Sequence, residues 1–224
     1  MANRQLRRAR AALAAITALV FGCLAAPAEA GPAGQGRASI DLDAGWRFQR
    51  GDVPDAVKPG FDDSAWSRVS VPHTWNAEDG QDGGGDYYRG TGWYRKHLVV
   101  PPSMAGRKLW LQFDGANSTA TVWVNGTRLG EHKGGYSGFR FDATDALRPG
   151  RDNLISVSVS NAPDPAVAPL SGDFTMGGGI YREVSLVATD RLHVDMLDFG
   201  GPGVYSRGGQ GFAGAVRWAG RVVS

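Results

Sequence analysis

The sequence predicts an all-β chain folded as an antiparallel sandwich or barrel. Apolar and polar residues alternate over many short runs, turn-forming residues separate these runs, and stripes with the period of an α-helix are scarce. Many short strands without interleaved helices are typical of antiparallel architectures. The composition, with 42% apolar and 21% charged residues, excludes a wholly disordered chain.

The first thirty residues have the pattern of an export signal. An uncharged, mostly apolar run over residues 11–26 leads to the small-x-small sequence Ala28-Glu29-Ala30. The basic residues before it are Arg4, Arg7, Arg8 and Arg10. We expect residues 1–30 to be a signal peptide and the rest to be periplasmic or extracellular. A lipoprotein anchor at Cys23 is a minor alternative, and the run is shorter than the roughly 20 residues that span a bilayer.

The charge balance argues against nucleic acid as a partner. Of the 24 basic and 22 acidic residues, four arginines and Glu29 lie in the expected signal, so the remainder is close to neutral. No basic tract is left to neutralise a phosphate backbone. The single cysteine, Cys23, also lies in the signal, so the remainder has neither a disulfide nor a thiolate metal site.

The expected strands follow one another from residue 40 onward, and most end at Pro, Gly, Asp or Asn. They are Ile40–Leu42, Trp66–Val71, Trp93–Val100, Leu109–Phe113, Thr121–Val124, Thr127–Leu129, Phe139–Phe141, Leu154–Val159, Ile180–Val187 and His193–Leu197. Residues 142–150 are expected to form a short helical turn or a loop between two strands.

Two patterns are specific enough to predict local geometry. Asn125-Gly126 lies between two alternating runs, which predicts a hairpin with a two-residue turn. In the run 154–159, the odd-numbered residues are Ile and Val, so that face is expected to be buried and the other face polar. We expect Trp93, Trp110 and Trp123 to pack in the core, whereas Trp75 fits packing or sugar stacking equally well.

The stretch 74–92 is expected to be a long surface loop. It holds many Gly and Asp residues, which no buried strand tolerates, and long loops on rigid sandwiches often carry function. No phosphate-binding, zinc-protease or nucleophile-elbow motif occurs elsewhere, and the four histidines lack metal-ligand spacing. Residues 200–224 are rich in Gly with little alternation, which predicts a disordered or aberrant tail.

Ordered motifs over about 150 residues resemble the sugar-binding domain of glycoside hydrolase family 2, the β-galactosidase and β-glucuronidase family. The segments that carry the resemblance are Phe61–Trp66, Val71–Asn76, Gly90–Lys96, Phe113–Ser118, Val122–Gly126, Gly135–Tyr136, Phe139–Asp142 and Gly179–Val184. The resemblance implies a jelly-roll β-sandwich over residues 31–188. Residues 189–224 then resemble the truncated start of an immunoglobulin-like domain.

The resemblance also implies where a saccharide would bind. In such enzymes the sandwich lends loops to the rim of a sugar pocket, and an acidic residue before the Gly-Ile-Tyr-Arg sequence maps onto Asp173. A carboxylate suits that position because it accepts two hydrogen bonds from adjacent sugar hydroxyls. From the loop before Trp93, the candidates are Asp86, Tyr88 and Arg89. The stretch Gly84-Gly85 departs from the family pattern there and blurs this mapping.

The resemblance assigns no catalytic residue to this chain. The (β/α)₈ barrel with its acid/base and nucleophile glutamates is not present, so the chain alone is expected to be inactive although the family is one of glycosidases. No cofactor is implied. Related jelly rolls often carry structural calcium, but the loop oxygens of Asp82 or Asp86 are too generic to assign.

Two functional readings stay open. The chain is the truncated amino-terminal domain of a β-galactosidase-like hydrolase, or it is a stand-alone exported carbohydrate-binding module or adhesive surface protein. The expected partner is a carbohydrate of β-galactoside type, and the oligomeric state is not predicted. Titration with galactosides and glucuronides separates the two readings, because only a stand-alone module is expected to bind them by itself.

Overall fold

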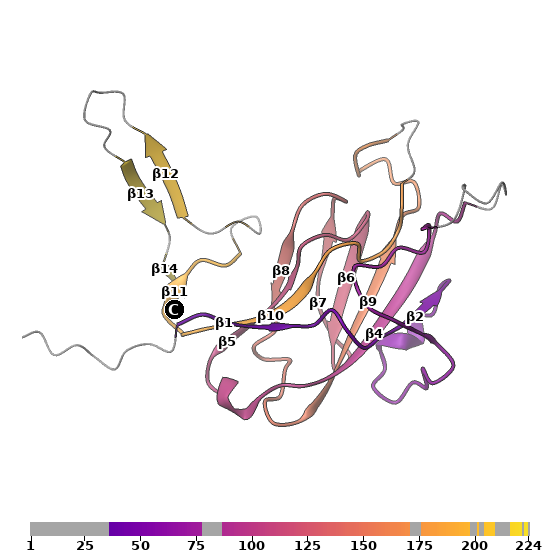
Figure 1. Cartoon of the computed structure of the whole chain (residues 1–224), viewed down its shortest axis with the longest axis horizontal. Helices are drawn as coiled ribbons and strands as arrows, with labels where there is room; N and C mark the ends of the chain where they lie inside the picture. The colour runs from indigo at the N-terminus through magenta and orange to yellow at the C-terminus, as the bar shows by residue number, and fades with distance from the viewer. Residues whose placement is uncertain are drawn as a thin grey trace, which may run out of the picture. The chain divides into compact units, whose positions relative to one another are not determined.

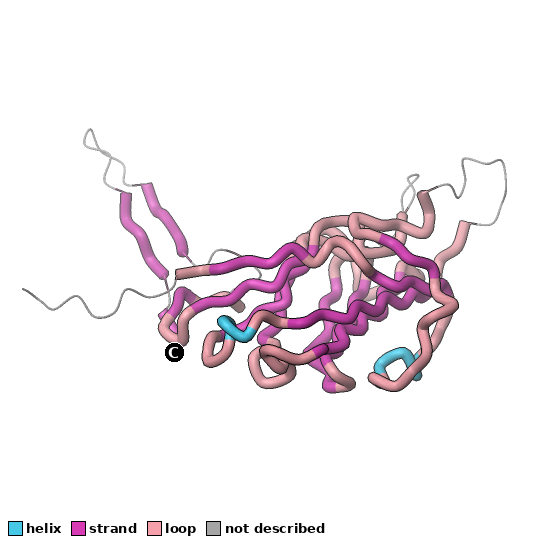
Figure 2. Tube along the Cα trace, turned by 60° about the horizontal axis from the view of Figure 1, so that its bottom comes forward, coloured by secondary structure: helices cyan, strands magenta, loops and turns pink. Residues whose placement is uncertain are grey.

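The computed structural model describes residues 36–77, 87–170, 176–197, 201, 204–208, 216–220 and 222–223. Strands dominate this part of the chain, and its helix is confined to two short 3₁₀ turns, η1 (Pro54–Val57) and η2 (Pro102–Met104) (Figure 2). None of its helices has the length and apolar character that crossing a membrane requires.

Two antiparallel sheets form the fold (Figure 1). The four-stranded sheet has the order β1 (Ala38–Asp41), β10 (Val184–Thr189), β5 (Lys108–Phe113), β8 (Phe139–Asp142). The six-stranded sheet has the order β3 (Ser67–Val69), β2 (Trp46–Arg50), β4 (Thr91–Val99), β9 (Asp152–Ser160), β6 (Thr119–Val124), β7 (Thr127–Lys133). Both sheets are open and share one apolar core, so the predicted all-β fold is confirmed as a sandwich.

The main core takes one face of each sheet. The four-stranded sheet contributes buried side chains such as Leu111, Phe113 and Leu186, and the six-stranded sheet contributes Val122 and Val157, all of them inaccessible to solvent. Alternate residues of each strand point into this core, as the period of two predicts. The hydrophobic effect therefore holds the two layers together without any cross-link.

The predicted hairpin is confirmed at β6–β7. Asn125 and Gly126 both have positive φ, 52° and 84°, as the two-residue turn requires. The Asn125 side chain also fixes the neighbouring chain: its Nδ2 donates to Ala146 O at 2.8 Å, and its Oδ1 accepts from Leu154 N at 2.9 Å. One residue type thus supplies both the turn conformation and an anchor to β9.

The outer face of the six-stranded sheet is covered rather than solvated. Trp93 packs there with Ala56 and Trp66 from the segment 51–66, which includes η1. Ser156, expected on a polar face of β9, is buried there, and its Oγ donates to Ala56 O at 2.9 Å. The predicted alternation of apolar and polar residues in β9 is confirmed. Its polar face is nevertheless covered by the segment 51–66, which the alternation does not predict.

A buried ion pair fixes that covering segment. The Arg95 side chain is fully buried, and its Nη1 contacts Asp63 Oδ2 at 2.5 Å. Arg95 also donates to Lys58 O and to Phe61 O, each at 3.0 Å. Burial lowers the pKa of Arg95, and the Asp63 carboxylate opposes this shift. One side chain of β4 therefore joins three points of the covering segment.

Trp93 and Trp110 are buried as predicted, but in small apolar clusters outside the main core, and Trp123 is only half-buried. Trp93 is buried and stacks on half-buried Trp123 with a centroid distance of 5.3 Å. Trp110 is buried on the outer face of the four-stranded sheet, and its Nε1 donates to Thr189 Oγ1 at 3.1 Å. Met196, which follows the sandwich in sequence, packs against Trp110 and Val187 on that face.

Four short strands are described beyond β10. β11 (His193–Val194) pairs with β14 (Val222–Val223), and β12 (Val204–Gly208) pairs with β13 (Val216–Gly220). The strand expected over 193–197 is thus present in its first two residues. The boundary after residue 188, the immunoglobulin-like start and the aberrant tail stay predictions.

Candidate functional site

Three segments meet at one end of the sandwich: the connection that leads into β4, the segment that follows β9, and the segment that leads into β10. Backbone hydrogen bonds join them, from Asn161 N to Gly90 O at 3.1 Å and from Trp75 N to Gly178 O at 3.2 Å. The first continues the β4–β9 pairing, in which Thr91 lies opposite Ser160. This end is where the long loop was expected to carry function.

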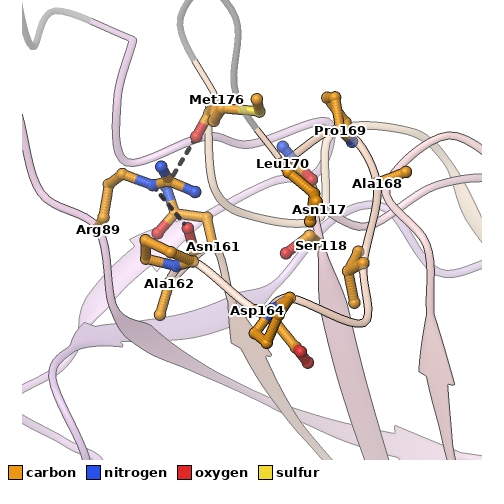
Figure 3. Close-up of a pocket in the computed structure, with 13 residues that line it drawn as sticks. Arg89, Asn117, Ser118, Asn161, Ala162, Asp164, Ala168, Pro169, Leu170 and Met176 are labelled. Atoms are coloured by element: carbon orange, nitrogen blue, oxygen red, sulfur yellow. Dashed lines mark hydrogen bonds between the residues drawn. The ribbon is translucent and has the colours of Figure 1, made fainter.

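Asn161 is the centre of this arrangement. Its side chain is buried, and its Nδ2 donates to Met176 O at 2.8 Å and to Asn76 Oδ1 at 3.1 Å. Its Oδ1 accepts from Gly90 N at 2.9 Å. One amide therefore joins all three segments (Figure 3 shows the bond to Met176). A buried amide with its donors and acceptor satisfied stabilises the geometry around it.

Asn76 extends the same network. Its side chain is buried, its Nδ2 donates to Tyr88 O at 3.0 Å, and its Oδ1 accepts from Gly178 N at 2.7 Å. Asn76 precedes the undescribed residues 78–86, and Tyr88 follows them. The two ends of that stretch are therefore held together. We name Asn76 and Asn161 the asparagine clamp.

Trp75 packs inside this end of the sandwich. Its ring is 9% exposed and stacks on Phe48 with centroids 5.8 Å apart and planes 13° apart. A Cβ at Gly178 would lie 2.1 Å from Trp75 Cζ2, and one at Gly92 would lie 2.6 Å from Cζ3. Glycine is required at both positions for the ring to fit. Of the two readings for Trp75, the structure supports packing.

His73 and Tyr94 support the clamp from the core side. His73 Nδ1 lies 2.7 Å from the Tyr94 hydroxyl, and His73 N donates to Ile180 O at 2.7 Å. Burial lowers the pKa of His73 and raises that of Tyr94. Both side chains are therefore neutral near pH 7, and a hydrogen bond joins the imidazole to the Tyr94 hydroxyl, which also accepts from Ile180 N.

A cavity of about 270 Å³ opens beside Asn161 (Figure 3). We name it the clamp cavity. Its polar lining comes from Arg89, Asn117, Ser118, Asn161 and Asp164. The rest is mostly apolar and comes from residues 162–170 and Met176. Its volume lies just below the roughly 300–1,000 Å³ of typical small-molecule sites.

The apolar wall of the clamp cavity is built by a proline-rich segment. Pro163, Pro165 and Pro169 restrict the backbone there, because proline fixes its own φ. Asp164 Oδ1 accepts from Ala166 N at 2.8 Å and closes a local turn. Proline residues and a local hydrogen bond therefore restrict the backbone conformation of this wall.

The four predicted sugar contacts have different outcomes. Arg89 lines the clamp cavity, and its Nε donates to Asn161 O at 2.9 Å. Tyr88 does not line it: its hydroxyl donates to Thr91 O at 3.0 Å, and its ring lies under the Arg50 guanidinium. Asp86 and Asp173 lie outside the described residues, so their roles stay predictions.

Sequence reasoning missed the residues that build the cavity. Asn161 and the segment 162–170 were not singled out, although Asn-Ala-Pro-Asp-Pro after a strand is a strong turn signal. Asn117 was noticed only as part of the resemblance. Among the described residues, no group of three or more His, Cys, Asp or Glu could hold a metal ion, and Asp82 and Asp86 fall outside them.

Comparison with known proteins identifies the domain. The family model described as glycosyl hydrolases family 2, sugar binding domain, matches residues 40–190. A β-glucuronidase of Bacteroides fragilis is 46% identical over 138 residues, covering 62% of this chain and 20% of that protein. The β-galactosidase BoGH2A of Bacteroides ovatus is 36% identical over 176 residues, covering 75% of this chain and 20% of that protein.

Solved structures agree with these relatives. Bacteroides uniformis β-glucuronidase 2, covalently bound to cyclophellitol-6-carboxylate aziridine, has a TM-score of 0.78 and 37% identity, over 83% of this chain and 22% of that one. The chain spans about one fifth of the length of the relatives it matches. The chain belongs to glycoside hydrolase family 2, and residues 40–190 form its sugar-binding domain.

Proposed function

We propose that the chain contributes to the hydrolysis of β-galactosides or β-glucuronides by binding one sugar ring in the clamp cavity. The clamp cavity itself is the observation that carries this proposal. It offers polar groups at one side and a stiff apolar wall at the other, the usual composition of a small-ligand site. Relatives named β-glucuronidase and β-galactosidase supply the two sugar classes.

We propose that cleavage of the glycosidic bond needs a pair of carboxyl groups that the described residues do not provide. A retaining glycosidase uses two carboxyl groups roughly 5–5.5 Å apart across the scissile bond. The one carboxylate among the described residues that line the clamp cavity is Asp164, and Lys133 holds it at 3.1 Å. Export, inferred from residues 1–30, remains part of the proposal.

Calorimetric titration of the chain with methyl β-D-galactoside and methyl β-D-glucuronide tests this function. The sequence predicts such binding only for a stand-alone module. Because residues of this chain line the clamp cavity, we expect saturable binding at millimolar concentrations by the chain itself and no hydrolysis of nitrophenyl glycosides. Weak binding is expected because one ring buries little surface and its immobilisation carries an entropic cost. Absence of binding to both sugars contradicts the proposal, and turnover by the chain alone contradicts the assignment of cleavage to other groups.

A further inference from the structure

The residues that lead into the sandwich lie beside the residues that leave it. β1 and β10 are antiparallel neighbours, and Ala38 lies opposite Ala188, so the start of β1 is next to the end of β10 (Figure 1). We name residues 36–37 the entry segment and residues 190–197 the exit segment. Apart from Asp190, both lie outside the residues 40–190 that the family model matches, so the family assignment does not account for their contacts.

The exit segment packs back onto the outer face of the four-stranded sheet. Met196 is 2% exposed and lies against Trp110 and Val187, and the His193 ring lies 5.3 Å from the Trp110 ring, measured between centroids. Leu192, in contrast, is 69% exposed. A cavity of about 320 Å³ lies between the entry and exit segments and is lined by residues of both. Apolar packing therefore holds the exit segment at a few points, chiefly around Met196, rather than along its length.

Two arginines connect the exit segment to the entry segment. Arg37 of the entry segment donates from Nη2 to Met196 Sδ. Arg107, which directly precedes β5, donates from Nη2 to Gly36 O, and the same group lies 3.7 Å from Asp190 Oδ1. Both ends of the exit segment are therefore connected to the entry segment, Asp190 through Arg107 and Met196 through Arg37.

The Met196 sulfur is an uncommon partner for a guanidinium. It accepts from Arg37 Nη2 and also from Arg140 Nη1, although a thioether is a weak acceptor. Burial, together with the nearby charge of Arg37, lowers the pKa of Arg140, because the two guanidinium groups converge on one side chain. A weak acceptor does not order a flexible arginine by itself, since ordering carries an entropic cost. The bond to Arg37 therefore depends on packing that fixes the sulfur, and the bond in turn reinforces that packing.

We propose that Arg37 positions the exit segment on the four-stranded sheet through Met196, so that a residue before β1 controls the local order of the chain after β10. Arg37 is a positioning residue in this account. Opening of the exit segment then has a free energy of its own, smaller than that of global unfolding. The coupling does not involve the clamp cavity, so it is independent of the proposed function.

Amide hydrogen exchange of the full chain tests this coupling, because it reports local opening separately from global unfolding. In Arg37→Gln, we expect the amides of residues 192–197 to exchange about fivefold faster, the scale of one hydrogen bond. Met196→Leu keeps the apolar packing on Trp110 and removes the acceptor, so it should cause a similar increase. In the double variant, the increase should not exceed that of Met196→Leu alone, because both residues act through the same bond.

Arg68→Gln is the matched control, because it removes the same charge from an exposed position on β3, in the other sheet. It should leave the exchange of residues 192–197 unchanged. The amides of β5, in the core, should change by less than about twofold in every variant. Unchanged exchange in Arg37→Gln, fully additive effects in the double variant, or an equal increase in β5 would each overturn the coupling.

Discussion

Asn161 shows how one buried amide can hold three segments together at one end of a sandwich. The backbone of a strand residue forms hydrogen bonds only to the adjacent strands. The Asn161 side chain instead forms hydrogen bonds to the two segments that precede β4 and β10. The cost of leaving such a group unsatisfied exceeds the gain of any one of its bonds. The contribution of the clamp to the free energy of unfolding can therefore be measured separately from sugar binding.

Asn161→Asp is the sharpest test of the clamp. It keeps the shape but replaces Nδ2 by an oxygen that would face Asn76 Oδ1 and Met176 O, both acceptors. We expect a loss of about 2–3 kcal/mol in the free energy of unfolding, measured with urea. Gln49→Glu adds the same charge on the exposed Gln49 and should cost less than about 0.5 kcal/mol. Equal effects of the two variants would contradict the clamp.

At the residue scale, the sequence predicted turn chemistry well and buried networks poorly. Asn125-Gly126 was predicted because the requirement for positive φ is local. The partners of Asn161 lie at residues 76, 90 and 176, and no local pattern connects them. Arg89 was found through the family resemblance, whereas the cavity beside it required the packed structure.

The covering segment 51–66 is an element in which a buried ion pair adds to apolar packing. Its apolar residues pack on Trp93 and Trp123, and fully buried Arg95 holds it through Asp63 and two backbone carbonyls. Removal of one partner of a buried pair leaves an uncompensated charge, which costs more than the pair contributes.

Asp63→Asn therefore should lower the free energy of unfolding by about 3 kcal/mol, measured by urea denaturation. Fluorescence of Trp66, which belongs to this segment, and of Trp93, on which the segment packs, should shift to the red as water enters. Asp62→Asn is the matched control, because Asp62 is exposed and its carboxylate bonds locally to Ser64, two residues away, rather than to Arg95. A comparable loss in both variants would contradict a specific role for the Arg95–Asp63 pair.

At the element scale, strand positions were predictable and their coverage was not. Alternation identified β4 to β10 because each strand has one face in the shared core. The same alternation placed Ser156 on a polar face, whereas η1 closes that face. Polar residues on a strand indicate a face outside the core, but they do not show whether solvent or another segment meets it.

The whole domain should lose stability in mild acid because of two half-buried histidines. Burial lowers the folded-state pKa of His73 and of His132 below the usual value of 6.5. Below pH 6.5 the unfolded chain binds protons that the folded chain still excludes, so the unfolding equilibrium shifts toward the unfolded state.

Urea denaturation at pH 7.5, 6.0 and 5.0 should therefore give a free energy of unfolding that becomes smaller at each lower pH. Carboxyl groups such as Asp142, whose pKa lies below 3.8, contribute only in stronger acid. His132→Asn should reduce the drop, because it removes one of the two half-buried imidazoles. A stability that is flat or that rises between pH 7.5 and 5.0 would contradict a lowered pKa for these two histidines.

At the scale of the molecule, the two-layer architecture and the family were predictable from residues 40–190, whereas the site was only partly so. The alternation of apolar and polar residues predicts strands with one buried face, and the ordered family motifs predict which type of sandwich the strands form. The clamp cavity arises where three segments distant in sequence meet, so its volume and lining follow from packing rather than from any one motif.

The most direct test of the account is a titration with methyl β-D-glucuronide followed residue by residue through backbone amide chemical shifts. We expect the largest changes at Arg89, Ser118, Asn161 and Val167, with little change along the core strands. Shifts centred on the groove between β7 and β8, which Glu131, Phe139 and Leu197 line, would place the sugar elsewhere and contradict the account.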